Sequence, residues 1–454
     1  MSHKTSFLGT EPIFRLLLKM SIPATIGMLV NALYNIVDTI FVGRGVGKEG
    51  IAALTIIFPI QMIVSSFAQA MGFGAASVLS RRLGEKRYED AADMIGTAYT
   101  FVFISTWLLV GLLFAFLEPI LRFFGTDDVI MPYTKDYLMI VGFGFIFFSM
   151  SMTANSLVRA EGNPKASMNS MLIGAITNVI LDPIFIFGLK WGIKGAATAT
   201  VISQIVSCGY ILSLYVFKRN HITVHRTNFK IRFDLLGDSA LVGIPSFVQQ
   251  AGMCILAIVT NNTLLTYGGK MAITVFGMVH KFNMIIIMPI IGIAQGFQPI
   301  AGYNYGACDF GRVIKSVKTA IATAFIVACV GTAIAMLFPR QCMSIFITDS
   351  EVLNMSTFVV RMICSLITLA SVQIVGATFF QAVGKPVQSL VMGLMRSFIC
   401  LIPLLLILPR LFGLNGIWWS YPAADLLGTI ITLVFLIPSL MHLRERMAAA
   451  IHNA

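Results

Sequence analysis

The chain contains an internal repeat in which corresponding residues lie 222 positions apart. The run from Phe124 to Asp127 corresponds in this way to the run from Phe346 to Asp349. The other matching pairs are Pro23 and Pro245, Gly74 and Gly296, Gly84 and Gly306, Gly162 and Gly384, and Pro164 and Pro386. A collinear series without insertions indicates two related halves, produced by internal duplication.

Composition restricts the environment in which these halves fold. Of 454 residues, 57% are hydrophobic and 11% are charged, and the mean hydropathy is +0.86. A soluble domain carries roughly 25% charged residues, so this chain cannot cover a water-exposed surface. The sequence predicts an all-α polytopic membrane protein, and internally duplicated membrane proteins are typically transporters.

Apolar runs of roughly 20 residues predict twelve transmembrane helices in two six-helix lobes. Because six is even, both lobes enter the membrane in the same orientation. We expect an N-terminal lobe at 1–217, a cytoplasmic linker at 218–238 and a C-terminal lobe at 239–454. The predicted spans are 13–42, 51–80, 93–118, 133–158, 165–188, 195–217, 239–267, 272–302, 312–337, 355–382, 387–409 and 415–440.

The distribution of basic residues predicts the orientation. With the N-terminus inside, the inner segments carry 20 Lys and Arg and the outer loops carry 9. Positive charge favours the cytoplasmic side, so we expect both termini to be cytoplasmic in a multi-pass protein of the plasma (bacterial inner) membrane. This bias also accounts for the net charge of +12 without a nucleic-acid partner. The first apolar run is too long for a signal peptide and is expected to be retained.

Sequence motifs for enzymatic chemistry and for metal binding are absent. The seven cysteines are scattered without a CxxC motif, and no Cys/His spacing that would hold a metal is present. No Gly-x-Ser-x-Gly motif or channel filter repeat is present. We therefore expect no cofactor, no metal centre and no enzymatic activity, in a monomer.

Of the 20 carboxylates, 17 fall in loops or at the ends of predicted spans, and three lie well inside spans, namely Asp38, Asp182 and Asp425. An ionised carboxylate in hydrocarbon is costly, so each is a candidate functional residue. The alternative is a purely structural role, in which the acid makes a buried hydrogen bond. This alternative is strongest for Asp425, which can join the last helix to its own lobe. We treat Asp425 as a secondary candidate.

The two N-terminal acids have polar neighbours at helical spacing. Asp38 ends a face that also contains Asn31, Tyr34 and Asn35. Asp182 shares a face with Asn178 at i and i+4. The following Pro183 leaves a backbone carbonyl unpaired. These oxygens suit a proton or a small hard cation.

The repeat separates these acids from the duplicated scaffold. Thr260 stands at the position corresponding to Asp38, and Leu404 at that corresponding to Asp182. If these acids had a structural role in each lobe, an acid would be expected at both corresponding positions of the repeat. The asymmetry instead predicts a coupling site confined to the N-terminal lobe, with the two carboxylates roughly 6 Å apart or less, within one bridging water.

Several stretches resemble the multidrug and toxic compound extrusion (MATE) family of cation-coupled exporters. They are Asn31–Arg44, Arg159–Pro164, Asn178–Pro183 and Gly195–Thr200. The resemblance covers the whole chain and implies two six-helix lobes that alternate about a central cleft. It further implies an ion site formed by Asp38, Asn155, Asn178, Asp182 and Thr200. Members of the family that bind sodium in the C-terminal lobe use acidic residues in the seventh and tenth spans. The corresponding spans of this chain, 239–267 and 355–382, contain no acidic residue.

The sequence leaves three classes of function open. The first is an antiporter that exports amphiphilic, mostly cationic organic compounds. The second is an exporter or flippase of a specific metabolite or lipid-linked substrate, which would be expected to use several basic residues inside spans. Apart from the basic residues near span ends, only Lys281, Arg361 and Arg396 lie there. The third is a non-transporter membrane protein. For the first class we expect protons as the coupling ion, because two interacting carboxyls titrate as a unit, with sodium at Asp38, Asn178, Asp182 and Thr200 as the alternative.

Overall fold

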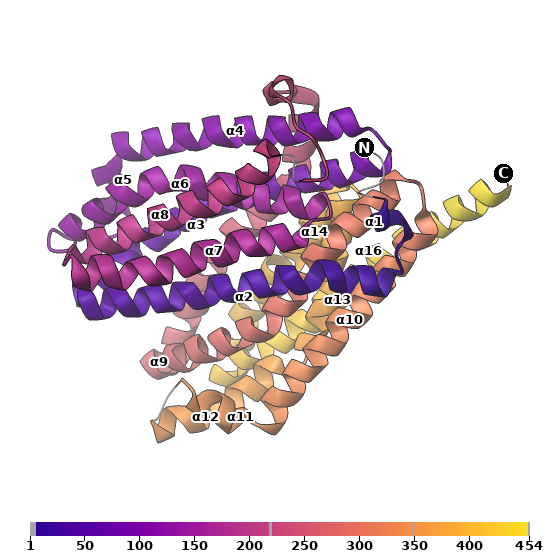
Figure 1. Cartoon of the computed structure of the whole chain (residues 1–454). Coiled ribbons are helices and arrows are strands. Elements are labelled where there is room, and N and C mark those ends of the chain that lie inside the picture. Colours follow the sequence, from indigo (N-terminus) through magenta and orange to yellow (C-terminus); the bar gives the residue numbers. More distant parts are fainter. Residues whose placement is uncertain (1–5, 218–219, 347–348, 453–454) are drawn as a thin grey trace. The chain divides into compact units, whose positions relative to one another are not determined.

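The computed structural model describes residues 6–217, 220–346 and 349–452, and these ranges are helical without a β-strand (Figure 1). The all-α prediction is confirmed. Residues 218–219 of the predicted linker and 347–348 of the second repeat copy lie outside the described residues. The α-helices are α1 (Phe7–Thr10), α2 (Ile13–Gly45), α3 (Lys48–Gly84), α4 (Tyr88–Ala115), α5 (Leu117–Phe123), α6 (Met131–Ala160), α7 (Pro164–Pro183), α8 (Gly192–Val216), α9 (Phe233–Gly306), α10 (Phe310–Leu337), α11 (Pro339–Ser344), α12 (Ser350–Cys364), α13 (Ala370–Ala382), α14 (Pro386–Leu394), α15 (Ile402–Phe412) and α16 (Leu414–His452).

Eleven helices of the described chain are long and apolar enough to cross a membrane. One of them, α9, has 74 residues and contains a non-helical residue, Gly269, with φ 64° and ψ −163°. A straight helix of that length would measure about 110 Å, far more than the roughly 30 Å of a bilayer core. Helix α9 is therefore two spans joined at Gly269, which gives the twelve spans that the sequence predicts.

The chain forms two compact units. Unit 1 contains Ile26–Phe247 and the segment before residue 9, and unit 2 contains Gly9–Thr25 and the chain from residue 248 onward. These units differ from the predicted lobes in two segments: residues 9–25 pack with unit 2, and the chain up to residue 247 packs with unit 1. The lobe boundaries at 217 and 239 stay a prediction from the repeat.

Two segments pack with the unit formed mainly by the other half, and we call them exchanged segments. Each of them includes the beginning of the first helix of its own half. Helix α2 passes from unit 2 to unit 1 after Thr25, and α9 passes from unit 1 to unit 2 after Phe247. Thr25 and Phe247 are themselves repeat partners, and in each helix a proline, Pro23 or Pro245, precedes the crossing point by two positions. The exchange therefore follows the duplication.

Close backbone contacts hold the exchanged segments, and glycine makes them possible. In unit 1, a Cβ on Gly74 of α3 would lie 2.0 Å from the backbone oxygen of Ser239 in α9. In unit 2, a Cβ on Gly296 of α9 would lie 2.4 Å from Oγ of Ser21 in α2. Gly74 and Gly296 are repeat partners, so the same small-residue crossing occurs once in each unit.

The centre of unit 1 is α6, which packs against α3, α4, α7 and α8. Its side chains Val141 and Phe145 are buried in a cluster with Ile57 of α3 and Ala196 of α8. Figure 1 shows these helices running side by side. This packing brings polar residues of α2, α6, α7 and α8 to one level of the bundle, as described below.

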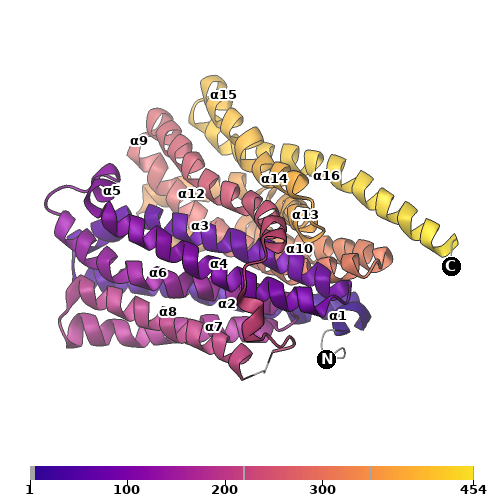
Figure 2. The same ribbon diagram turned by 90° about the horizontal axis from the view of Figure 1, so that it is seen from above.

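Unit 2 is built around α16, which packs against α10, α12, α13 and α15. Its largest fully buried side chains include Trp418 of α16 and the neighbours Phe379 and Phe380 of α13. Figure 2 shows α13, α14 and α16 close together in this unit. A π-helical segment, η4 (Met395–Leu401), joins α14 to α15 within one span.

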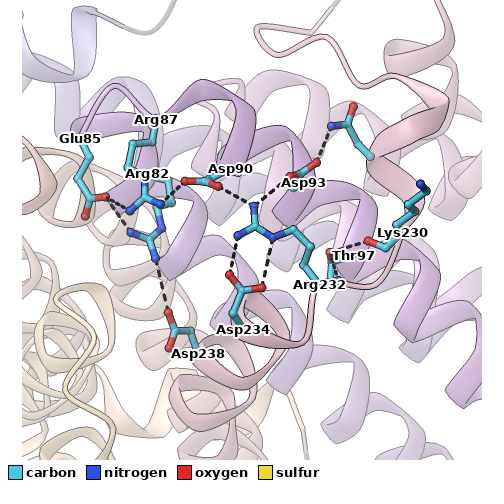
Figure 3. Close-up of polar contacts among 11 residues, drawn as sticks. Arg82, Glu85, Arg87, Asp90, Asp93, Thr97, Lys230, Arg232, Asp234 and Asp238 are labelled. Atoms are coloured by element: carbon cyan, nitrogen blue, oxygen red, sulfur yellow. Dashed lines mark hydrogen bonds and ion pairs between the residues drawn. The ribbon is translucent and has the colours of Figure 1, made fainter.

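The described part of the connection between the halves is bonded to unit 1 (Figure 3). Arg232 donates through Nη1 to Asp90 at 2.7 Å and to Asp93 at 3.1 Å, both on α4. Thr97 of α4 donates to the backbone oxygen of Lys230 at 3.3 Å. A Cβ on Gly96 would lie 2.1 Å from the backbone oxygen of Asn228. The described part of the predicted cytoplasmic linker thus packs along α4 through ion pairs and close backbone contacts.

We predict that Gly74→Val and Gly296→Val each destabilise the protein, because the added side chain overlaps the crossing helix. Overpacking of this kind costs about 1–3 kcal/mol, and thermal unfolding of the purified protein in detergent should show the loss. Gly111→Val is the matched control, since a Cβ at Gly111 meets nothing within 4 Å. Equal melting temperatures for all three variants would contradict the assigned crossings.

Candidate functional site

Two carboxyl groups meet inside unit 1. Asp38 comes from α2 and is half-buried, whereas Asp182 comes from the end of α7 and is fully buried. The two carboxyl groups lie within hydrogen-bonding reach of each other, which agrees with the separation expected from the sequence. No donor among the described residues reaches Oδ1 of Asp38 or Oδ2 of Asp182. Because one oxygen of each facing acid lacks a donor, the pair favours a proton or a cation between the two carboxyl groups.

The end of α7 places Asp182 and its amide neighbour on one face. Pro183 lacks an N–H, and the chain continues as a π-helical turn, η1 (Ile184–Gly188). Asn178, one turn earlier, donates from Nδ2 to Oδ1 of Asp182 at 3.4 Å and to Oγ1 of Thr200 at 3.5 Å. Thr200 in turn donates to the backbone oxygen of Ala196 at 3.0 Å. This chain of bonds joins Asp182, Asn178 and Thr200 as the sequence analysis expected.

The structure adds Tyr137, which the sequence analysis did not single out. Its side chain is 2% exposed. It lies within reach of Thr200 and near the carboxyl groups of Asp38 and Asp182. Tyr137 stands directly after Lys135 and Asp136, near the start of a predicted span, and helical periodicity alone carried no sign of this role. Its phenol can donate a hydrogen bond to a carboxylate.

The other residues of the predicted polar face on α2 are placed less completely. Tyr34 lies near Tyr137, and Asn31 and Tyr34 both make polar contacts. The side chain of Asn35 lies outside the described part of the chain. The assignment of Asn31, Tyr34 and Asn35 to the site stays a prediction.

Asn155 lies in a separate network of hydroxyl groups. Its Nδ2 donates to Oγ of Ser151 at 3.4 Å. Ser151 contacts Ser207 at 3.2 Å, and Ser207 contacts Ser170 at 2.9 Å. Ser207 lies two turns beyond Thr200 on α8, a rise of about 10 Å. Within the described chain no hydrogen bond joins Asn155 to either acid, so its predicted place in the ion site stays a prediction.

Asp425, the secondary candidate, lies in unit 2 on α16. It is 1% exposed and accepts a hydrogen bond from Nε of Arg396 at 2.5 Å. This acid is therefore neutralised by a base of its own unit, unlike the acid pair of unit 1.

The oxygens of unit 1 suit a proton or a small monovalent ion. The described residues contain no cluster of three or more His, Cys, Asp and Glu side chains that could hold a metal. Oδ1 of Asn178 is buried without a donor, as are the two carboxylate oxygens described above. Acceptors outnumber donors among these groups, which favours a proton or a cation as an added partner.

Comparison with known proteins places the chain in a family. The MatE family model matches it twice, at residues 23–184 and 245–407, and the two matches begin at the repeat partners Pro23 and Pro245. The multidrug export proteins MepA of Staphylococcus aureus (strain MSSA476) and Staphylococcus haemolyticus (strain JCSC1435) are each 27% identical over 419 residues. These alignments cover 91% of this chain and 91% of each relative.

Solved structures give the same result for the fold. One is described as the outward-facing conformation of a multidrug resistance MATE family transporter of the MOP superfamily. It has a TM-score of 0.92 at 25% identity and covers 98% of this chain and 99% of its own. A MATE structure in the straight conformation has a TM-score of 0.92 at 25% identity, with 97% and 99% covered.

A further buried carboxyl group lies at the end of α6, just outside the span. Glu161 is fully buried and accepts hydrogen bonds from the Tyr215 hydroxyl at 2.5 Å and from the backbone N–H of Ile222 at 3.4 Å. Burial raises the pKa of Glu161 to about 8, although these hydrogen bonds oppose the shift. The residue lies within the stretch Arg159–Pro164, but its place after a predicted span made it look like a loop acid.

We predict that Glu161 makes stability fall as pH rises. From about pH 4.5 to about pH 8 the folded protein holds a proton that the unfolded chain releases, so the free energy of unfolding decreases through this range. Glu161→Gln should remove this loss, which is on the order of a few kcal/mol. Unfolding of both proteins at about pH 5 and pH 8 measures it. The exposed-residue control Glu89→Gln should keep the wild-type slope, and an equal slope for Glu161→Gln would refute the prediction.

Proposed function

The chain belongs to the MATE family, whose members are transporters rather than enzymes, and on this basis we propose that it is a multidrug efflux antiporter. It exports amphiphilic, mostly cationic organic compounds, and it takes up protons in exchange. The relatives named MepA are multidrug export proteins, which supports this substrate class. The proposal includes a monomer that alternates between access to the two sides of the membrane.

The contact between Asp38 and Asp182 carries the proposal for coupling. Two carboxyl groups in contact inside the protein repel each other strongly when both are ionised. The pair therefore keeps one bound proton, which leaves it with a single negative charge. Asn178 provides a donor to Asp182 in the form that has lost this proton, and Tyr137 lies near both acids. The pair is therefore a group that exchanges a proton as a unit.

Proton exchange at this pair biases the conformation in the way that antiport requires. With the proton absent, the pair is an anionic site that attracts an organic cation. With the proton bound, the charge that holds the cation is gone. A ligand shifts a conformational equilibrium only if its affinity differs between the two states. The proton and the organic cation meet this condition when they compete for the negative charge of the Asp38–Asp182 pair.

The orientation follows from the positive charge of the loops. Twenty Lys and Arg lie in segments that we assign to the cytoplasm, against nine in the outer loops. Both termini are cytoplasmic in this arrangement, and the membrane is the plasma (bacterial inner) membrane. Exported compounds then move outward while protons move inward.

We predict that Asp38→Asn and Asp182→Asn each abolish efflux of a fluorescent cation such as ethidium while leaving the purified protein monodisperse. Because the two acids act as one group, the double variant should be no worse than either single variant. Efflux from cells, measured with and without an uncoupler, tests this. Asp128→Asn, a change at an exposed acid, should export normally. Normal efflux by Asp38→Asn would remove the acid pair from the mechanism.

A second prediction separates the two ions. In proteoliposomes at low sodium, an inward proton gradient should drive export of the cation, whereas an inward sodium gradient at fixed pH should drive little. Both ions can use the oxygens of Asp38, Asn178, Asp182 and Thr200, so their gradients are tested separately on the same preparation. Export driven by sodium alone would assign the acid pair to sodium instead of protons.

A further inference from the structure

The two units differ in how they balance positive charge at the end that carries most of their basic residues. In unit 1, where α3 ends and α4 begins, Arg82, Arg87 and Arg232 each pair with at least one carboxylate (Figure 3). In unit 2, where α10 begins and α16 ends, the described residues include eight basic and three acidic ones. The basic residues are Arg15, Lys19, Arg312, Lys315, Lys318, Lys385, Arg444 and Arg446, and the acidic residues are Glu11, Asp309 and Glu445. Unit 2 therefore has an excess of positive charge at this end.

The three acids at this end of unit 2 already have partners. Glu11 pairs with Nζ of Lys19 at 2.8 Å. Asp309 caps α10, because its Oδ1 accepts a hydrogen bond from the backbone N–H of Arg312 at 3.0 Å. Glu445 lies 3.8 Å from a histidine in the preceding turn of α16. No carboxylate at this end is thus left to neutralise the remaining basic residues.

Two contacts fix the beginning of α10 against the end of α16. Cζ of Arg446 lies 4.7 Å from the centroid of the Phe310 ring. A Cβ on Gly311 would lie 3.2 Å from Sδ of Met447. The two helices are therefore in direct contact where both leave the membrane-spanning part of unit 2.

This contact gathers four basic residues. Lys315 and Lys318 lie one and two turns after Gly311 on the same face of α10, and Arg444 lies on α16 two residues before Arg446. All four basic side chains are exposed, and within the described chain none of them pairs with a carboxylate. We call Lys315, Lys318, Arg444 and Arg446 the basic seam.

The depth of the seam matches the level of lipid headgroups. Helix α10 has 28 residues, about 42 Å, so roughly 6 Å extends beyond each side of a bilayer core of about 30 Å. Lys315 and Lys318 are five and eight residues from its start, or about 7 and 12 Å along the axis. This is the boundary of the core, from which a lysine side chain extends toward the phosphate level.

The same face of α10 becomes apolar farther into the membrane. Phe325, seven residues after Lys318, is 41% exposed, and Ile326 beside it is 63% exposed. A face that is cationic at the headgroup level and apolar at the level of the acyl chains has the two properties of a phospholipid with a negative headgroup. A free anion would match only the first of them.

We propose that the basic seam binds the headgroup of an anionic phospholipid whose acyl chains lie along α10. Basic side chains near the membrane surface attract anionic lipids, and lysine and arginine both bond to phosphate oxygens. A zwitterionic headgroup brings its own cation and gains less from the seam. In the orientation proposed above, this lipid belongs to the cytoplasmic leaflet. The site requires only that the chain spans a membrane, and it does not depend on the acid pair or on the coupling ion.

Lipid retention by the delipidated, detergent-purified protein tests the site. The protein is mixed with equal amounts of phosphatidylglycerol and phosphatidylcholine that carry the same acyl chains. The lipid that elutes with it from a size-exclusion column is then quantified by mass spectrometry. Both lipids contain a phosphate, but only phosphatidylglycerol has a net negative charge. The wild type should retain about fivefold more phosphatidylglycerol, which corresponds to the contribution of one basic residue near an anionic surface.

The test variant combines Lys315→Gln, Lys318→Gln and Arg444→Gln, and it should retain the two lipids equally. These side chains are exposed and unpaired within the described chain, so the variant should elute as the wild type does. Lys315→Gln and Lys318→Gln are also measured singly, and each should lose part of the preference. They keep the proposal testable if the triple variant does not fold.

The matched control combines Lys270→Gln, Arg340→Gln and Arg410→Gln, which remove three exposed basic residues at the opposite end of unit 2. It should keep the fivefold preference. Equal retention of both lipids by the wild type would overturn the proposal, as would a preference that the single and triple variants keep. Release of phosphatidylglycerol by inorganic phosphate at constant ionic strength would also overturn it, because the seam would then be a site for free anions.

Discussion

A charged group in the hydrocarbon core of a membrane is costly unless a partner or water satisfies it, and this cost governs where the chain places its acids. The two units meet the constraint differently. In unit 1, Asp38 faces a second acid, Asp182. In unit 2, Asp425 faces a base, Arg396. The same apolar scaffold, present twice along the chain, thus holds two opposite electrostatic arrangements.

The two arrangements have different consequences. An acid–acid contact leaves one oxygen of each acid without a donor, so it favours an added proton or cation. An acid–base contact supplies its own counter-charge and holds the guanidinium of Arg396 in one orientation. The ion exchange that we propose therefore uses the acid pair of unit 1.

Much of this could be predicted from the sequence, because the signals are local or periodic. Apolar runs mark the twelve spans, and the spacing of Asn178 and Asp182 on one helix predicts their contact. Tyr137 could not be found in this way, because a tyrosine near the start of a span comes close to Thr200 and the acid pair only through the packing of α6 on α8. Glu161 and Arg232 also depend on tertiary contacts. The described part of the linker, which the sequence alone does not place against any helix, is bonded along α4. The same linker covers Glu161, whose position after a span resembles that of a loop residue.

The exchange of the first helices links the acid pair to both units. Helix α2 belongs to unit 2 up to Thr25 and to unit 1 from Ile26, and Asp38 lies on its second part. A close crossing against Gly296 fixes the first part to unit 2, whereas the contact with Asp182 fixes the second part to unit 1. Between them lies Pro23, where the helix lacks one backbone hydrogen bond and bends at lower cost. In the proposed mechanism, a proton that changes the contact between Asp38 and Asp182 acts on a helix that both units share, about four turns beyond Pro23.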